Sequence, residues 1–394
     1  MAGWQPASRA LMAGNFAIGC GVMVVPGSLN DLSQSLAVSP AVAGQLITAG
    51  AVAMGTGAPL LAAALARFDR RALLTLALLW YGAGHALAAL APGYAALLSL
   101  RVLGVLGAAV FTPQAAAAIN FLAPAAQRGR AITTVFLGWS LSSVLGMPMG
   151  SFIAETFGWR WAFAAVALLS VVAALGVWRA VPSGVKPPPL SWHSWRTALT
   201  HPVLMGMVAV TALSAAGQFT LFSYFAPYYR QVLGASATQV SLLFFWFGAF
   251  GLLGNVLLSR HIDRLGAARC VNIALVLMAL SLLLWPLTGP QGPLLAMTGL
   301  AGMALVLVPW ALGCFSCNSA QQARLSQASQ AFAPALLALN TSAIYAGQAL
   351  GAAGGGALLS ARGFGPLPWA GLTWMALALG LSVWATRRMR VAHG

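Results

Sequence analysis

Long, nearly uninterrupted apolar runs fill most of this chain and limit what it can fold into. Twelve runs can be delimited, at 10–29, 41–65, 72–92, 94–118, 132–155, 160–180, 202–226, 237–259, 271–289, 293–317, 331–357 and 366–386. A membrane-spanning α-helix needs about 20 apolar residues. A strand of a membrane β-barrel needs only about 10 residues, which alternate between apolar and polar. The runs therefore predict an all-α membrane protein with twelve transmembrane helices and exclude a closed barrel.

The scarcity of charged residues agrees with a lipid environment. Only 6% of the 394 residues are charged, whereas a soluble domain carries about 25%. The 20 Lys and Arg residues and 4 Asp and Glu residues give a net charge of +16, which could indicate a nucleic-acid partner. Here, however, the basic residues stand in short clusters between apolar runs, as signals of membrane topology do. We therefore expect the chain to contact a lipid bilayer and no nucleic acid.

The distribution of the basic residues predicts the orientation of the chain. If the N-terminus is cytoplasmic, the segments on the inner side hold sixteen Lys and Arg residues and those on the outer side hold three, while Arg101 falls within a span. Lys and Arg are enriched in cytoplasmic loops. We therefore expect both termini in the cytoplasm, and we interpret the first run as an uncleaved span.

The longest polar break lies near the middle of the chain. It runs from Val181 to Thr200 and contains three consecutive prolines, Pro187 to Pro189. Proline stiffens such a segment and cannot continue a helix. The expected organisation is a six-helix bundle at 1–181, a cytoplasmic linker at 182–200 and a second six-helix bundle at 201–394.

Two features recur at an offset of about half the chain length. Arg67 and Arg264 stand 197 residues apart in short basic loops. A pair of glycines spaced by four, Gly146 and Gly150, recurs 201 residues further on. Two equivalent halves are typical of transporters whose substrate cavity lies between the repeats.

At these positions the chain resembles the major facilitator superfamily, and within it the drug and sugar efflux branch of arabinose efflux permease-like proteins. The resemblance covers essentially the whole chain. It is carried by Asp263-Arg264-x-Gly266-x-x-Arg269 after the eighth span, Arg101-x-x-Gly104-x-x-Gly107 in the fourth, Gly146-Met147-Pro148-Met149-Gly150 in the fifth, Gly57-Ala58-Pro59 in the second and Asn340 to Gly356 in the eleventh. The first-half copy of the loop departs from the family pattern, with Ala66 in the Asp position and Asp69 in the Gly position.

The resemblance implies roles for the loop charges and for the glycines. The charged loop residues would form a gate that closes the cytoplasmic side, and these gate candidates are Arg67, Asp69, Arg70, Asp263, Arg264 and Arg269. Close packing and bending of the fifth and eleventh spans would depend on Gly146, Pro148, Gly150, Gly347 and Gly351. The alternatives are that the basic residues only determine topology and that the glycines only allow packing.

Polar side chains within spans are candidates for substrate binding, because hydrocarbon offers them no water. The resemblance implies that spans 1, 4, 7 and 10 line the cavity and that spans 2, 5, 8 and 11 flank it. The substrate-binding candidates are therefore Asn15, Arg101, Gln114, Gln218, Tyr224, Trp310, Asn340 and Tyr345. An ordinary contact between helices is the alternative for each. His85 falls in the third span, outside the implied cavity, and is interpreted as a packing residue.

Carboxylates are the usual groups that couple a carrier to protons. Outside the cytoplasmic loops this chain has only Asp31 and Glu155, each at the outer end of a span. We predict that Asp31 and Arg101 form the proton-sensitive pair, directly or through water, with Glu155 as the second candidate. The alternative is that Asp31 caps a helix or faces solvent.

Signatures of an enzyme are lacking in the sequence. There is no Walker A sequence, no convincing pair of carboxylates in mid-membrane, and no His, Cys and Asp cluster with metal-ligand spacing. We therefore expect a monomeric secondary transporter that works by alternating access and needs no cofactor.

The expected activity is export of a small organic molecule, of the drug, sugar or nucleoside class, in exchange for protons. A facilitative or import carrier without proton coupling is the main alternative, and a membrane-embedded enzyme or a channel is a more distant one. The excess of Arg over Lys, 19 to 1, indicates a GC-rich bacterial genome, and so a bacterial inner membrane.

Overall fold

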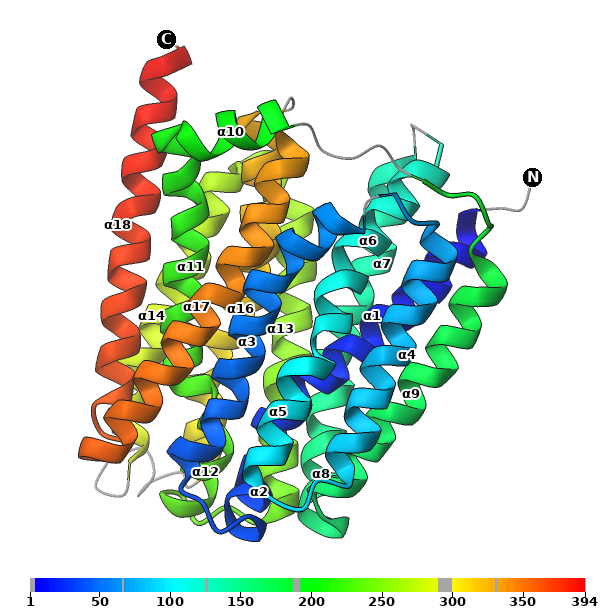
Figure 1. The fold of residues 1–394 in the computed structure, drawn as a ribbon. Helices are drawn as coiled ribbons and strands as arrows, with labels where there is room; N and C mark the ends of the chain where they lie inside the picture. The colour runs from blue at the N-terminus through cyan, green and yellow to red at the C-terminus, as the bar shows by residue number, and fades with distance from the viewer. Residues whose placement is uncertain are drawn as a thin grey trace. The chain divides into compact units, whose positions relative to one another are not determined.

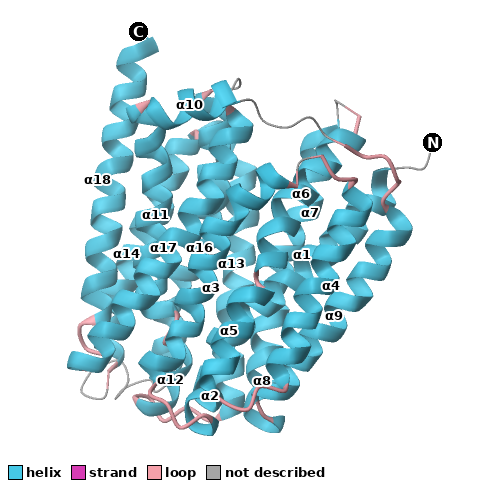
Figure 2. Ribbon diagram, in the orientation of Figure 1, coloured by secondary structure: helices cyan, strands magenta, loops and turns pink. Residues whose placement is uncertain are grey.

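A computed structural model of the chain describes residues 4–65, 67–124, 127–186, 192–289, 300–329 and 332–393. Within these ranges the regular elements are helices, and Figure 2 shows them joined by loops without a strand. The all-α prediction is thus confirmed. The helices divide into two compact units.

The first unit comprises residues 1–39 and 52–189. Its helices are α1 (Trp4–Gly27), α2 (Leu29–Ser35), α4 (Arg70–Ala89), α5 (Tyr94–Gly104), α6 (Leu106–Leu122), α7 (Arg128–Leu141), α8 (Met147–Phe157) and α9 (Trp159–Ala180), and a π-helical turn, η2 (Ser142–Gly146), joins α7 to α8. Helix α1 packs against α7 and α9, and α4 packs against α6 and α9. Figure 1 shows α1, α4 and α9 side by side.

The second unit comprises residues 40–51 and 190–394. Its helices are α10 (Trp192–Thr200), α11 (Pro202–Phe222), α12 (Phe225–Gln231), α13 (Ala237–Leu265), α14 (Ala267–Leu284), α16 (Leu300–Ala328), α17 (Ala333–Arg362) and α18 (Leu367–His393), with a 3₁₀ turn, η3 (Trp285–Thr288). Helix α3 (Pro40–Ala64) is divided between the units at Ala51 and Val52. Helix α11 packs against both α17 and α18 (Figure 1).

The helices agree with the predicted membrane spans. Among the described residues, eleven helical stretches are long and apolar enough to cross a membrane, and each matches one of the twelve predicted spans. The remaining predicted span, 331–357, corresponds to α17, which has 30 residues but contains the polar residues Asn340, Thr341 and Gln348. The predicted linker includes one element that the sequence analysis did not anticipate, because residues 192–200 form α10. The three prolines before it lie outside the described residues.

The tenth span extends beyond its predicted C-terminal end at residue 317. Helix α16 begins at Leu300 and continues to Ala328, so Arg324 lies within it instead of in an inner loop. Arg324 is buried, and its guanidinium donates to Ser382 Oγ at 2.9 Å, to the Ser382 carbonyl at 3.0 Å and to Thr386 Oγ1 at 3.0 Å. It therefore connects α16 to α18. Without it the inner segments hold fifteen basic residues against three, so the predicted orientation is unchanged.

The two units repeat the same order of helices. Helices α2 and α12 begin at residues 29 and 225, α3 and α13 at 40 and 237, and α4 and α14 at 70 and 267. The offsets are 196, 197 and 197 residues. This constant offset extends the predicted repeat from two motifs to the helices themselves.

The fifth span is interrupted by the π-helical turn η2, which ends two residues before Pro148. Proline has no N–H, and in a regular helix its ring would collide with the carbonyl four residues earlier, at Val144. A π-turn widens the helix locally and is often found at functional sites. The structure thus places an irregular turn beside the proline that the sequence analysis nominated for bending.

Glycines of the fifth and eleventh spans lie against the first helix of their unit. A Cβ at Gly146 would lie 2.5 Å from Cys20 Sγ on α1, and Cβ atoms at Gly347 and Gly351 would collide with backbone carbonyls of α11. Gly150 differs, because a Cβ there would meet its nearest neighbour, Val24 Cα, at an ordinary 3.8 Å. Of the four predicted packing glycines, Gly150 alone therefore has room for a methyl group.

We expect Gly347→Ala to destabilise the protein by about 1–3 kcal/mol, because the added methyl group would overlap the Ala212 carbonyl. Gly354→Ala, on the same helix with nothing within 4 Å of the added Cβ, is the matched control. It should be neutral or slightly stabilising, since alanine favours helix. Thermal unfolding in detergent measures both. Equal melting temperatures for the two variants would contradict the close contact of α17 with α11.

Candidate functional site

Helix α11 carries a row of polar side chains, Thr211, Ser214 and Gln218, whose spacing places them on one face. Thr211 Oγ1 donates to Asn340 Oδ1 on α17. Gln218 Nε2 donates to Ser214 Oγ at 3.3 Å, and Ser214 Oγ lies 3.8 Å from Cys317 Sγ on α16. The predicted site residues Gln218 and Asn340 thus belong to one polar row. Its other members were not predicted from the sequence, although their spacing of three and four residues could have indicated them.

Asn340 has an unused donor within this row. Its side chain is 1% exposed, and its Nδ2 is buried without a hydrogen-bond partner among the described residues. A buried N–H without an acceptor is unfavourable, so such groups in native proteins usually meet water or a ligand. Asn340 is therefore the candidate in the second unit best able to donate to a bound molecule.

Asn15 occupies the corresponding place in the first unit. Its Nδ2 donates to the Val135 carbonyl at 3.0 Å, and its Oδ1 accepts from Thr112 Oγ1 at 2.9 Å. It precedes Thr211 by 196 residues, which is the offset between α2 and α12. In this structure Asn15 joins α1 to α6 and α7.

Gln114, two residues beyond Thr112 on α6, is 6% exposed. It forms no hydrogen bond with the residues that the structure describes. Its amide can both donate and accept. Gln114 is therefore the substrate-binding candidate in the first unit with an uncommitted side chain.

Arg101 on α5 is buried in a cluster with His85 and Tyr81 on α4. One guanidinium nitrogen of Arg101 donates to the Gly21 carbonyl at 2.8 Å and lies 3.2 Å from His85 Nε2. The other ring nitrogen of His85, Nδ1, lies 2.9 Å from the Tyr81 carbonyl. Arginine only donates and a carbonyl only accepts, so the contacts fit a neutral His85 with its hydrogen on Nδ1. His85, interpreted from the sequence as a packing residue, is thus also a direct partner of Arg101.

Asp31 and Glu155 lie at the ends of α2 and α8. Asp31 Oδ2 accepts a hydrogen bond from the backbone N–H of Trp159, the first residue of α9, and Glu155 Oε1 accepts one from Asn30 Nδ2 at 3.3 Å. Partial burial raises the pKa of Asp31, while the Trp159 N–H and the positive charge of Arg160 act in the opposite direction. Both carboxylates therefore hold α2 against the α8–α9 connection.

Asp31 and Arg101 form no direct bond with each other in the structure, and a pair bridged by water stays a prediction. Asp31 is bonded to the N-terminus of α9, where free N–H groups and the helix dipole favour a negative charge. Arg101 is bonded to Gly21 and His85. The proposed alternative, that Asp31 caps a helix, matches these contacts.

The aromatic candidates of the second unit are buried. Tyr224 Oη donates to the Ala352 carbonyl at 2.7 Å. Trp310 is 0% exposed within a group of rings, 5.3 Å from Phe225 and 6.0 Å from Trp285 between centroids, and its Nε1 has no partner among the described residues. Tyr345 is 6% exposed on α17. The ring group around Phe225 was not anticipated, because its members come from five elements spread along the sequence, α11, α12, α13, η3 and α16.

The gate candidates lie at two helix connections, between α3 and α4 and between α13 and α14. Asp69 caps α4 by accepting from the Ala72 N–H at 3.3 Å and also accepts from the Gly184 N–H. Arg70 is buried and donates to the Phe68 carbonyl at 2.8 Å, while Arg67 is exposed. Arg264 and Arg269 are exposed at the second connection. Asp263 lies on α13, and its side chain is outside the described residues, as is Ala66. The gate therefore stays a prediction.

The chain is similar to known proteins in family, sequence and structure. The sequence model of the Major Facilitator Superfamily matches residues 11–352. The inner membrane transport protein YdhP of Escherichia coli K12 is 29% identical over 380 residues, which are 96% of this chain and 95% of that protein. A chloramphenicol resistance protein of Streptomyces lividans is 32% identical over 302 residues, 75% of this chain and 74% of that protein. The crystal structure of a D-xylose-proton symporter has the same fold, with a TM-score of 0.75 at 18% identity over 98% of this chain and 96% of that one.

We expect His85→Phe to lower the free energy of unfolding by about 1–3 kcal/mol, because Arg101 would keep its buried charge and lose an acceptor. His85→Gln should be milder, since its amide oxygen can accept the same bond. Thermal unfolding of the purified variants makes the comparison. If the two substitutions shifted the melting temperature equally, the His85–Arg101 bond would have no energetic role.

Proposed function

The chain belongs to the Major Facilitator Superfamily, and from this premise we propose that it is a secondary transporter that exports a small, uncharged organic molecule in exchange for protons. The observation that carries the proposal is the similarity to a chloramphenicol resistance protein, at 32% identity over three quarters of this chain. Resistance of that kind requires removal or inactivation of the drug, and a membrane carrier removes it. We infer an inner-membrane location from the similarity to an inner membrane transport protein, and both termini in the cytoplasm from the basic loops.

The chemistry of the candidate side chains supports an uncharged substrate. Among the described residues, the neutral candidate groups with unused hydrogen-bonding capacity include the amides of Gln114 and Asn340 and the indole of Trp310. Arg101, the one cation among the substrate candidates, is bonded through Nη1 within its own cluster, although its Nε has no partner there. Amides and aromatic rings recognise neutral polar and aromatic compounds. A compound such as chloramphenicol therefore fits these groups better than an ion does.

Alternating access is the mechanism we propose for this transport. The bundles predicted at 1–181 and 201–394 would rock about a substrate site between them, and the loop residues around Asp69 and Asp263 would close the cytoplasmic side. The glycine contacts of α1 with η2 and of α11 with α17 support the movement of each bundle as a rigid body. A monomer is sufficient for this cycle.

The proposal is tested with purified protein in liposomes that enclose a pH-sensitive dye, with chloramphenicol as the substrate. We expect saturable chloramphenicol transport and a proton flux in the opposite direction, because antiport exchanges the two. A protonophore should abolish accumulation against a gradient. Saturable transport without a proton flux would instead identify a facilitative carrier, and a flux in the same direction would identify a symporter.

Asp31→Asn tests whether Asp31 couples protons to transport. We expect loss of pH-gradient-driven transport and retention of chloramphenicol counterflow, because Asn can still accept the Trp159 N–H bond but cannot titrate. Glu155→Gln, at the same end of the first unit, tests the second candidate in the same assay and should keep gradient-driven transport if Asp31 is the coupling group. Full gradient-driven transport in Asp31→Asn would remove Asp31 from the mechanism.

The stability of the same variant gives a second readout. Because burial raises the native pKa of Asp31, the native protein binds this proton more readily than the unfolded chain. The resulting stabilisation is present at low pH and is lost as the pH rises through the raised pKa. Asp31→Asn should remove this part of the pH dependence of the melting temperature.

A further inference from the structure

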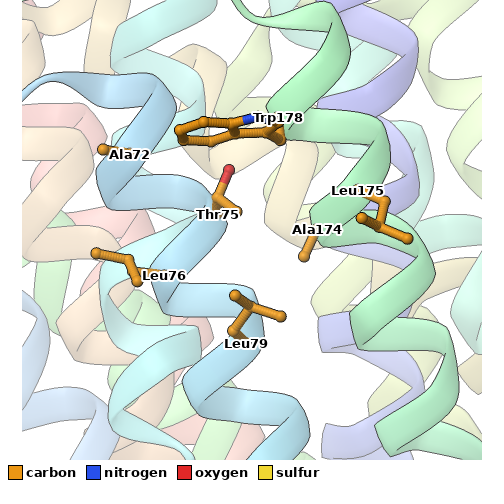
Figure 3. A pocket seen from close by; sticks show the side chains of 7 residues that line it. All are labelled: Ala72, Thr75, Leu76, Leu79, Ala174, Leu175 and Trp178. Atoms are coloured by element: carbon orange, nitrogen blue, oxygen red, sulfur yellow. The ribbon is translucent and has the colours of Figure 1, made fainter.

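An apolar groove of about 470 Å³ lies between α4 and α9. Figure 3 shows the side chains that line it, with the indole of Trp178 across one end. The groove opens at the surface of the first unit, since Leu76 is 63% exposed, Leu175 is 51% exposed and Trp178 is 48% exposed. Its volume falls within the range of about 300–1,000 Å³ that is usual for ligand pockets. An open apolar groove on a membrane helix pair is accessible to lipid chains.

A polar group without a partner lies inside this groove. Thr75 is only 9% exposed, and its Oγ1 is buried without a hydrogen-bond partner among the described residues. In Figure 3 its hydroxyl points along the groove toward Trp178. Threonines of other spans bond the carbonyl four residues earlier, as Thr56 does at 2.8 Å and Thr341 at 3.1 Å. The Thr75 hydroxyl is therefore free to donate to an acceptor in the groove.

Positive charge is concentrated at the Trp178 end. The guanidinium carbon of Arg71 lies 4.2 Å from the centroid of the Trp178 ring, and Arg71 Nε is buried with no partner in the described part of the chain. Arg179, the neighbour of Trp178, is exposed in the last turn of α9. The nearby carboxylate of Asp69 already accepts two backbone N–H groups. This end of the groove is thus complementary to an anion.

The length of the groove agrees with one leaflet of a bilayer. From Arg71 to Leu79, α4 rises about 12 Å at 1.5 Å per residue. One leaflet of the hydrocarbon core is about 15 Å deep, half of roughly 30 Å. A phosphate at Arg71 would therefore stand at the membrane surface while an apolar chain followed the groove inward. Basic pockets between transmembrane helices bind anionic head groups in this manner.

We propose that this groove is a binding site for an anionic glycerophospholipid. Its phosphate accepts from Arg71, its ester carbonyl accepts from the Thr75 hydroxyl, and one acyl chain lies along Leu76 and Leu79. The basic loops at this end are those that the positive-inside rule places in the cytoplasm, so the lipid comes from the inner leaflet. The site is independent of the transported substrate.

The test uses the full chain in lipid nanodiscs that contain a trace of phosphatidylglycerol with a photoreactive group in its acyl chain. We expect crosslinks in the peptides that contain Thr75 and Trp178. Phosphatidylcholine with the same acyl chain should label these peptides about tenfold less, because its phosphate is the same but its choline cation would be repelled by Arg71 and Arg179. Unlabelled phosphatidylglycerol should compete, and unlabelled phosphatidylcholine should not.

Two substitutions separate the charge from the hydroxyl. Arg71→Gln should lower crosslinking by phosphatidylglycerol to the level of phosphatidylcholine. Thr75→Val, which keeps the shape of the side chain, should lower crosslinking by both lipids. Arg160→Gln is the matched control, because Arg160 also stands over a tryptophan, Trp159, at 4.3 Å, but at the other end of α9. It should not change labelling of the groove.

Three results would overturn the proposal. Equal labelling by both lipids that is insensitive to Arg71→Gln would mean non-specific contact with acyl chains. Crosslinks from the groove to a second copy of the chain would mean an interface between proteins. Absence of label from the α4 and α9 peptides would mean that the groove is not a lipid site.

Discussion

The structure depends on the fact that hydrocarbon supplies no hydrogen-bond partners, so a spanning chain must satisfy its polar groups internally. Many hydroxyl groups do so within their own helix, as Ser170 and Thr220 do with carbonyls four residues earlier. Several larger polar groups connect helices instead. Arg324 joins α16 to α18, Arg101 joins α5 to α1 and α4, and Asn15 joins α1 to α6 and α7. The groups left without partners are therefore the ones with capacity for a ligand or lipid.

In each unit, two neighbouring spans are connected in two ways. A glycine allows close contact of their backbones, and a polar side chain forms a hydrogen bond between them. In the first unit Gly146 lies against α1 and Asn15 bonds the carbonyl of Val135. In the second unit Gly347 lies against α11 and Thr211 bonds Asn340. Because the glycines allow the two backbones to approach closely, these polar side chains can reach the neighbouring helix. The duplicated sequence thus produces a duplicated contact with different residues in the two copies.

The apolar runs and the repeat were enough to predict the helices, because helix formation in a membrane follows from length and hydropathy. Contacts between side chains were not predictable in this way. Opposite charge suggested that Asp31 and Arg101 form a pair. Asp31 instead accepts from the backbone N–H of Trp159, and a pattern of side chains cannot reveal a backbone donor. Spacing made Gly146 and Gly150 look alike, although the neighbouring atoms on α1 distinguish them. Only part of the polar row between α11 and α17 was predictable. The amides of Gln218 and Asn340 are conspicuous in an apolar span, whereas the hydroxyls of Thr211 and Ser214 resemble those of ordinary helix residues.

The π-turn before Pro148 determines which side of the later part of the fifth span faces α1. At about 100° per residue, Gly146 and Gly150 would stand about 80° and 120° around a regular helix from Gly138. One extra residue in the π-turn rotates the residues that follow back around the helix axis by about 100°. Gly138, Gly146 and Gly150 then lie within about 20° of one line along the surface of the helix. That line faces α1, where they meet Met12, Cys20 and Val24 in succession. The number of residues in this segment is therefore as constrained as their identity, since deletion of one would turn the whole of α8 away from α1.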